Sequence, residues 1–327
     1  MLINYVIRRV FSLIPTFILA TFLAWIVIEI APGDFANQFR FDLIDPGRAE
    51  RMREVLGLNQ PWYLRYFYWL KNLVLNGDLG ASMTSRGDVT ALVVPRMLNS
   101  LTLLLPATIL TFLIAIPIGV YSALRKYSIG DRILTVFSLV GLAIPNFFMA
   151  LILLAFAVGW YQNNLSFLIP TGGMTSSNFS QLSTWGQFKD IVWHLIGPTI
   201  VVTLSGLAFT SRIMRGEMLE VMGQDYVRTA KAKGLSQRAV TYKHAFRNAI
   251  LVLVATIGGI LPGLISGAGT VEFVLRWPGI TPLFITAIFA QDVYVIMALL
   301  TILTVFLMIG NLLSDLLLAA IDPRIRY

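Results

Sequence analysis

The stretch QDYVRTAKAKGLS, Gln224–Ser236, lies between two apolar segments that are each long enough to cross a bilayer. Asp225 is suited to the N-terminal cap or first turn of a helix, and Lys231 and Lys233 are cations near its C-terminal end. Gly234 suits the left-handed conformation that ends a helix. The stretch is therefore predicted to be a short, basic, amphipathic helix followed by a turn, after which its last residue caps a second helix.

The composition of the chain is that of a membrane protein. Of its 327 residues, 57% are hydrophobic and 13% are charged, and the mean hydropathy is +0.75, whereas soluble domains carry about 25% charged residues. The absence of cysteine excludes a disulfide framework and a thiolate metal site. The formal charge of +8 is spread between apolar runs, so membrane topology explains it better than nucleic-acid binding.

Six apolar segments are long enough to be membrane-spanning helices. They are residues 10–30, 101–124, 133–158, 191–213, 249–270 and 293–320. A cleaved signal peptide is the alternative interpretation of the first segment, because basic residues precede it. Residues 32–100 contain no spanning run but include Trp62–Leu75, an aromatic-rich segment typical of a helix at a membrane interface.

The predicted fold class is therefore an all-α membrane protein with six transmembrane helices. Its predicted parts are an N-terminal tail and first span over 1–31, an external insertion over 32–100, and a core domain over 101–327 that includes the loop 217–247. Most of the 25 Lys and Arg residues fall inside if the N-terminus is cytoplasmic, a bias that is sharpest between Arg125 and Arg132. This bias predicts that both termini and the 214–248 loop are cytoplasmic.

Two interpretations of the opening stretch remain open at this point. Such a basic loop can simply be held near anionic lipid. The small residues Thr229, Ala230 and Ala232 indicate a closer contact, because they allow the surface of a partner to approach the helix backbone.

A family resemblance favours the closer contact. The segment EMLEVMGQDYVRTAKAKGLSQRAVTYKHAFRNAI, residues 217–250, resembles the EAA loop of ATP-binding-cassette importer permeases of the dipeptide, oligopeptide and nickel branch. Arg228 stands at the position of the glutamate for which that loop is named, and Gly234 at the position of its glycine. Further segments look like the first permease subunit of that branch, namely VIRRV at 6–10, Pro32-Gly33-Asp34, LGLNQPWYLRYFYWL at 56–70, 77–80, Trp277-Pro278-Gly279 and 322–326.

The resemblance implies a six-helix type I importer permease with the MetI-like fold and a cytoplasmic EAA coupling helix, located in the inner membrane. Its implied partners are a second homologous permease subunit, two cytoplasmic ATPase subunits that hold ATP and Mg, an extracytoplasmic substrate-binding protein and membrane lipid. No cofactor or nucleic acid is expected on this chain. The residues expected to couple it to the ATPases are Asp225, Tyr226, Arg228, Thr229, Ala230, Lys231, Ala232, Lys233, Gly234, Leu235 and Ser236.

Two further groups of residues are candidates for function. Gly259, Gly263 and Gly267 recur every four residues, a pattern that lets helix backbones approach closely, either within the chain or across a pair of permeases. The translocation pathway or external gate has polar and aromatic candidates at Asn146, Ser205, Thr210, Glu272 and Trp277. An interfacial tryptophan and a surface ion pair between Glu272 and Arg276 are the alternative for the last two.

Enzymatic function has little support in the sequence. Neither a G-x-x-x-x-G-K-[ST] loop nor an H-E-x-x-H motif is present, so the chain is predicted not to be an enzyme. An ion-coupled secondary transporter is the rival class, but it would use buried acids, and the predicted spans carry few charges. Peptides are the expected cargo, with nickel or other metal chelates and glutathione as alternatives within the same branch.

Overall fold

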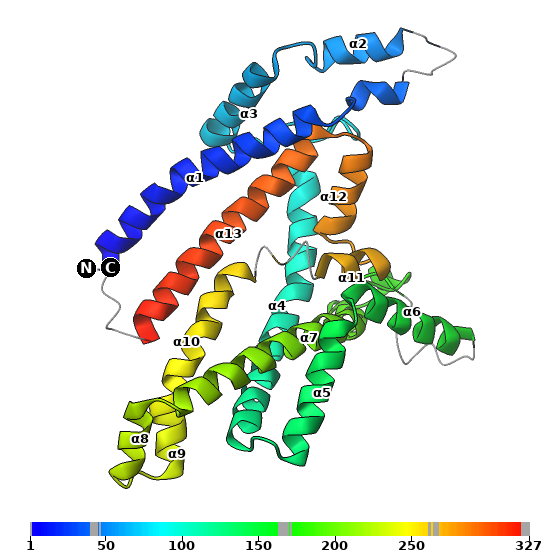
Figure 1. Cartoon of the computed structure of the whole chain (residues 1–327). Helices are drawn as coiled ribbons and strands as arrows, with labels where there is room; N and C mark the ends of the chain where they lie inside the picture. The colour runs from blue at the N-terminus through cyan, green and yellow to red at the C-terminus, as the bar shows by residue number, and fades with distance from the viewer. Residues whose placement is uncertain are drawn as a thin grey trace. The chain divides into compact units, whose positions relative to one another are not determined.

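A computed structural model describes residues 2–39, 45, 47–162, 170, 172–260, 263 and 268–321 of the chain, and helices dominate that part (Figure 1). Within these described ranges no strand occurs, and the only β-type pairing is an isolated bridge between Ala81 and Asp88. The chain divides into two compact units. The first comprises Met1–Asn99 and Gly279–Met308, and the second comprises Ser100–Pro278 and Ile309–Tyr327.

The first unit contains α1 (Leu2–Ile30), a 3₁₀ turn (Phe35–Phe39), α2 (Arg48–Val55), α3 (Trp62–Asn76) and α12 (Ile280–Phe289). It also contains the first parts of the long helices α4 (Val89–Leu124) and α13 (Val293–Ile321). The second unit contains the rest of α4 and α13. Its other elements are α5 (Ile129–Ala143), α6 (Asn146–Gln162), a 3₁₀ turn (Phe179–Gln181), α7 (Thr184–Met222), α8 (Asp225–Ala232), α9 (Gln237–Ala239), a π-helical turn (Val240–Ala245), α10 (Phe246–Thr256), a second 3₁₀ turn (Ile257–Gly259) and α11 (Gly269–Val274).

Aromatic side chains build the core of the first unit. Trp25 of α1, Tyr66 and Trp69 of α3 and Met297 of α13 are all buried and pack together. The Tyr66 hydroxyl lies 3.1 Å from the hydroxyl of Thr21, which satisfies the polar end of the buried ring. One face of α3 is thus structural, while other aromatic residues of the same helix, such as Phe67, stay exposed as expected for an interfacial helix.

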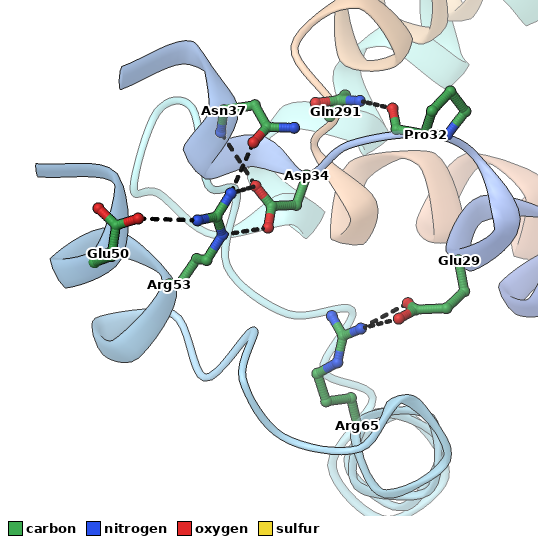
Figure 2. A network of polar contacts seen from close by, with 8 residues as sticks. All are labelled: Glu29, Pro32, Asp34, Asn37, Glu50, Arg53, Arg65 and Gln291. Carbon is green, nitrogen blue, oxygen red and sulfur yellow. Dashed lines mark hydrogen bonds and ion pairs between the residues drawn. The ribbon is translucent and has the colours of Figure 1, made fainter. Parts of the chain in front are cut away.

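Ion pairs fasten the insertion to the end of α1 (Figure 2). Arg53 of α2 donates to Asp34 at 2.7 Å and to Asn37 at 2.7 Å, and the Asp34 carboxylate raises the pKa of the Arg53 guanidinium above its usual value. Arg65 of α3 pairs with Glu29 in the last turn of α1 at 2.6 Å. These ion pairs tie α2 and α3 to the end of α1 and to the turn that follows it.

The start of α13 is fixed to the same unit by polar contacts. The Gln291 amide donates to the carbonyl of Pro32 at 2.9 Å (Figure 2). The carboxylate of Asp292, which is buried, accepts hydrogen bonds from the Ser82 hydroxyl at 2.7 Å and from the Thr84 backbone at 3.0 Å. These hydrogen bonds hold the loop before α4 against the start of α13.

Four described helices are long and apolar enough to cross a membrane, and a bent helix pair could make a fifth span. The four lie in Ile7–Phe39, Val89–Leu124, Thr184–Met222 and Val293–Ile321. The count of six predicted from the sequence is therefore met only in part. Two of the predicted spans, residues 133–158 and 249–270, differ from single continuous helices.

The predicted span 133–158 is bent by 95° between α5 and α6. Its break falls at Ile144, which is extended at φ −89° and ψ 118°. Pro145 follows, and a proline disfavours the helical conformation of the residue before it. The α-helix of the predicted span 249–270 is also interrupted, because α10 ends at Thr256 and a 3₁₀ turn follows it. Part of the rest of this span lies outside the described residues.

Candidate functional site

The predicted short helix is α8, Asp225–Ala232, and its ends follow the local signals. Gly234 has φ +75°, so the predicted left-handed conformation is confirmed. The Gly234 amide donates to the carbonyl of Lys231 at 3.0 Å, and the Leu235 amide donates to that of Ala230 at 3.4 Å. These two bonds form a Schellman motif, which closes the C-terminal end of the helix.

The inner face of α8 is formed by Val227 and Ala230, which are 0% and 6% exposed. Both belong to a core cluster with Met214 and Met218 of α7 and with side chains of α4, the π-helical turn and α10. The side chain of Ala230 is thus enclosed by its own chain, and a contact between Ala230 and a partner stays a prediction. Burial of about one valine contributes roughly 1.5–3 kcal/mol, which is enough to hold so short a helix in place.

The outer face of α8 is exposed and mainly cationic. Arg228 has a side chain that is 72% exposed, and its ion pair with Asp225 is loose at 3.4 Å. Such a surface pair contributes about 0–1 kcal/mol, so the Arg228 guanidinium can exchange Asp225 for another partner. The other exposed members of the predicted coupling set are Asp225, Tyr226, Thr229, Lys231, Ala232, Lys233, Gly234, Leu235 and Ser236.

The segment after α8 anchors it to the rest of the second unit. The Ser236 hydroxyl accepts a hydrogen bond from the Ala239 amide at 3.3 Å, so the predicted second cap is confirmed. The helix that it starts runs through a π-helical turn into α10. Asn248 of α10 donates to the hydroxyl of Tyr226 at 2.6 Å, and Arg247 donates to the carbonyl of Ile321 at 2.8 Å. Displacement of α8 is thereby linked to α10 and to the end of α13.

A buried ion pair that the sequence did not reveal joins α5 to α7. Arg215 donates to Asp131 through two nitrogens at 2.8 and 3.0 Å, and the Asp131 side chain is 3% exposed. Asp131 also accepts the Tyr127 amide at 2.8 Å. This pair ties the loop between α4 and α5 to the helix that leads into α8. The only signal in the sequence was charge at two positions that lie 84 residues apart.

Removal of the carboxylate should weaken this link. We expect Asp131→Asn to lower the free energy of unfolding by about 2 kcal/mol, less than the 3–5 kcal/mol of a fully buried pair, because Arg215 is 27% exposed and partly solvated. The thermal unfolding midpoint of the purified protein measures the change. Glu220→Gln is the control, since this exposed acid of α7 makes no ion pair within the described residues; equal midpoints for the two variants would contradict the assignment.

The three predicted glycines are described only in part. Gly259 ends a 3₁₀ turn, Gly263 has open space around it, and Gly267 lies outside the described residues. The close approach that the structure does contain is between Gly258 and Gly310, where a side chain on Gly310 would come within 2.6 Å of the Gly258 carbonyl oxygen. A packing role of the three predicted glycines stays a prediction.

The predicted pathway residues of spans three and four lie on two helices. Asn146 starts α6 and is half-buried, whereas Ser205 and Thr210 lie on α7. Five residues turn an α-helix by about 140° past a full turn, so these two point to different sides of α7. Thr210 is buried and Ser205 is half-buried. Their role in a pathway stays a prediction.

Glu272 and Trp277 were expected on the external surface, but both are 0% exposed. The alternative prediction of an interfacial tryptophan and a surface ion pair is therefore wrong. The Ser100 hydroxyl donates to the Glu272 carboxylate, and the Trp277 amide donates to the carbonyl of Glu272 at 2.8 Å. Arg276 between them has φ +54°, which marks a tight turn after α11. The buried Glu272 and Trp277 therefore hold this turn in place from the interior of the chain.

No cluster of three or more His, Asp or Glu side chains suited to a metal ion occurs in the part of the chain that the structure describes. The outer face of α8 is exposed and mainly cationic, and its inner face packs in a core cluster with side chains of α4, α7 and α10. Known families of membrane transport proteins match this chain.

Two family descriptions together match nearly the whole sequence. Residues 115–327 match "Binding-protein-dependent transport system inner membrane component", and residues 1–104 match the N-terminal part described for the same kind of membrane component. The chain is 40% identical over 327 residues to the oligopeptide transport system permease protein AppB of Bacillus subtilis, with 99% of each chain covered.

Two dipeptide permeases are also similar to it. The dipeptide transport system permease protein DppB of Escherichia coli strain K12 is 34% identical over 338 residues, which cover 100% of this chain and 99% of that protein. The protein of the same name from Alkalihalophilus pseudofirmus is 33% identical over 341 residues, with both chains covered fully. The chain therefore belongs to the family of inner membrane components of binding-protein-dependent transport systems, the permease subunits of ATP-binding-cassette importers.

Proposed function

We propose that this chain is one of two homologous permease subunits of an ATP-driven importer, and that α8 is the segment through which ATPase subunits move it. The observation that carries the proposal is the division of α8 into two faces. Val227 and Ala230 are buried in the core of the chain, while Arg228, Lys231 and Ala232 are exposed and leave a cationic surface with a small residue.

Such a helix fits a cleft on another protein. The small side chain of Ala232 allows close contact, and the surrounding cations provide electrostatic complementarity to an acidic rim. Two cytoplasmic ATPases that hold ATP and Mg are the proposed partners. When they close, force on α8 passes to α7 through Met214 and Met218 and to α10 through Asn248.

Orientation and domain organisation follow from the same proposal. Both termini and α8 are cytoplasmic, residues 1–31 hold the first span, and residues 101–327 form the core domain. Residues 32–100 form an external insertion that faces membrane lipid through the exposed aromatics of α3 and an extracytoplasmic binding protein beyond it. Six spans are retained in this proposal, with residues 249–270 as a broken fifth span.

Peptides are the proposed cargo. The similar proteins of Bacillus subtilis and Escherichia coli are named as oligopeptide and dipeptide permeases. Nickel or other metal chelates and glutathione remain the alternative cargo within the same branch. The ligand of the cognate binding protein distinguishes them, because that protein delivers the solute.

A reconstituted transporter tests the proposed function. The chain is placed in liposomes with its second permease, the ATPases and the binding protein, and uptake of a labelled dipeptide is measured. We expect uptake to require ATP inside the compartment that holds the ATPases and to be unaffected by collapse of proton and sodium gradients. Uptake driven by an ion gradient in the absence of ATPases would instead establish a secondary transporter.

A further inference from the structure

A second polar site lies in the second unit, apart from α8. An open pocket of about 260 Å³ lies between α4, α5 and α7. The polar side chains that line it are Ser122, Thr135, Ser138, Ser211, Arg212 and Arg215. This volume holds several water molecules, so it is large enough for a phosphate or carboxylate group.

The pocket carries one uncompensated positive charge. Arg215 is neutralised by Asp131, whose two carboxylate oxygens already accept both guanidinium hydrogen bonds and the Tyr127 amide. Arg212 lies one helical turn away on α7 and is exposed. Among the acids that the structure describes, none lies within ion-pair distance of Arg212. A guanidinium with no acid within ion-pair distance is free to form charge-assisted hydrogen bonds with an anion from outside the chain.

Hydroxyl groups complete the lining. The Ser138 and Ser211 hydroxyls lie 3.2 Å apart, and the lone pairs of one accept the proton of the other. The Ser211 hydroxyl also donates to the carbonyl of Ala208 at 3.4 Å, so Ser138 is the donor to Ser211, and its hydroxyl can rotate to donate to a ligand instead. We propose that Arg212, assisted by Ser211 and Ser138, binds a single oxyanion, a phosphate or a carboxylate, in this pocket.

Two sources could supply this oxyanion. One is the phosphodiester of an anionic membrane lipid, whose acyl chain would lie along aliphatic residues at the pocket edge such as Leu139, which is 50% exposed. The other is the terminal carboxylate of a peptide, and this source rests on the proposed function. The chemistry at Arg212 is the same in both cases, and the ion binds between α5 and α7, next to the Asp131–Arg215 link.

Ligand-dependent thermal unfolding of the complete transporter tests the site. The protein is purified in detergent without phospholipid and titrated with dioleoylphosphatidylglycerol, dioleoylphosphatidylcholine, dialanine or dialanine amide. A ligand that binds the folded state raises the unfolding midpoint, and the rise grows with the logarithm of the ligand concentration once this exceeds the dissociation constant. The variants are Arg212→Gln, Arg212→Lys and Ser138→Ala. Arg132→Gln is the matched control, because Arg132 is exposed on α5 and does not line the pocket.

We expect Arg212→Gln to weaken the response about tenfold, since charge-assisted hydrogen bonds contribute roughly 1.5–3 kcal/mol. Arg212→Lys should retain part of the response, Ser138→Ala should weaken the response severalfold, and Arg132→Gln should respond like the unmodified protein. A response to phosphatidylglycerol alone identifies the lipid, and one to dialanine but not its amide identifies the peptide carboxylate. If no ligand raises the midpoint, or if Arg212→Gln and Ser138→Ala both respond like the unmodified protein, the site is overturned. Because no uptake is measured, this outcome is independent of the test of the proposed function.

Discussion

Uptake by the complete transporter should fall at least tenfold when Ala232 is replaced by tryptophan, although the permease itself should fold and assemble. Ala232 is exposed at the last position of α8 and contributes nothing to the core beneath it. A large ring there would overpack a close contact with the ATPase, which costs about 1–3 kcal/mol of binding free energy. A loss of about 1.4 kcal/mol lowers an equilibrium constant tenfold. The uptake assay in liposomes measures the effect.

Ala232→Ser is the matched control, because it keeps the side chain small. It should retain uptake near that of the unmodified protein. The amount of each variant that copurifies with its second permease shows that the fold is intact. Normal uptake with tryptophan at this position would mean that nothing approaches α8 closely.

Val227→Asp should detach α8 from its support and abolish uptake. Val227 is 0% exposed and lies against Met214 and Met218. An unpaired carboxylate in this core costs several kcal/mol, which exceeds the burial energy that holds the helix. Limited proteolysis should then cleave the segment between Arg228 and Arg238 faster than in the unmodified protein.

Thr229→Asp introduces the same charge two residues later, on the exposed face of α8. It should leave the segment resistant to protease, because no buried contact is lost. Comparison of the two variants separates the support of α8 from its external contact. Equal protease sensitivity would contradict the assignment of Val227 to the inner face.

Local signals were sufficient to predict α8. The positions of Asp225, Lys231, Gly234 and Ser236 each have a local physical reason, and the structure agrees at all four. The direction in which the helix faces could not be predicted in this way. An eight-residue helix has only two apolar positions at helical spacing, so Ala230 was interpreted as a contact surface and Val227 was overlooked.

Contacts between distant segments explain the other differences. Asp131 and Arg215 were separate charges in the sequence, and only the packing of α5 on α7 makes them a pair. Residues 133–158 were predicted as one spanning helix, but the structure bends this segment by 95° at Ile144, which is extended before Pro145. Hydropathy measures the length of an apolar run and cannot distinguish a continuous helix from a bent one.

Site-specific photo-cross-linking tests the central claim most directly. A benzoylphenylalanine residue is placed at position 232 or, in a second preparation, at Ala91, an exposed residue of α4 on the proposed external side. After illumination of the assembled transporter, position 232 should cross-link to an ATPase subunit and Ala91 should not. A transporter that remains active and shows no cross-link from position 232 to an ATPase would contradict the assignment of α8 as the coupling helix.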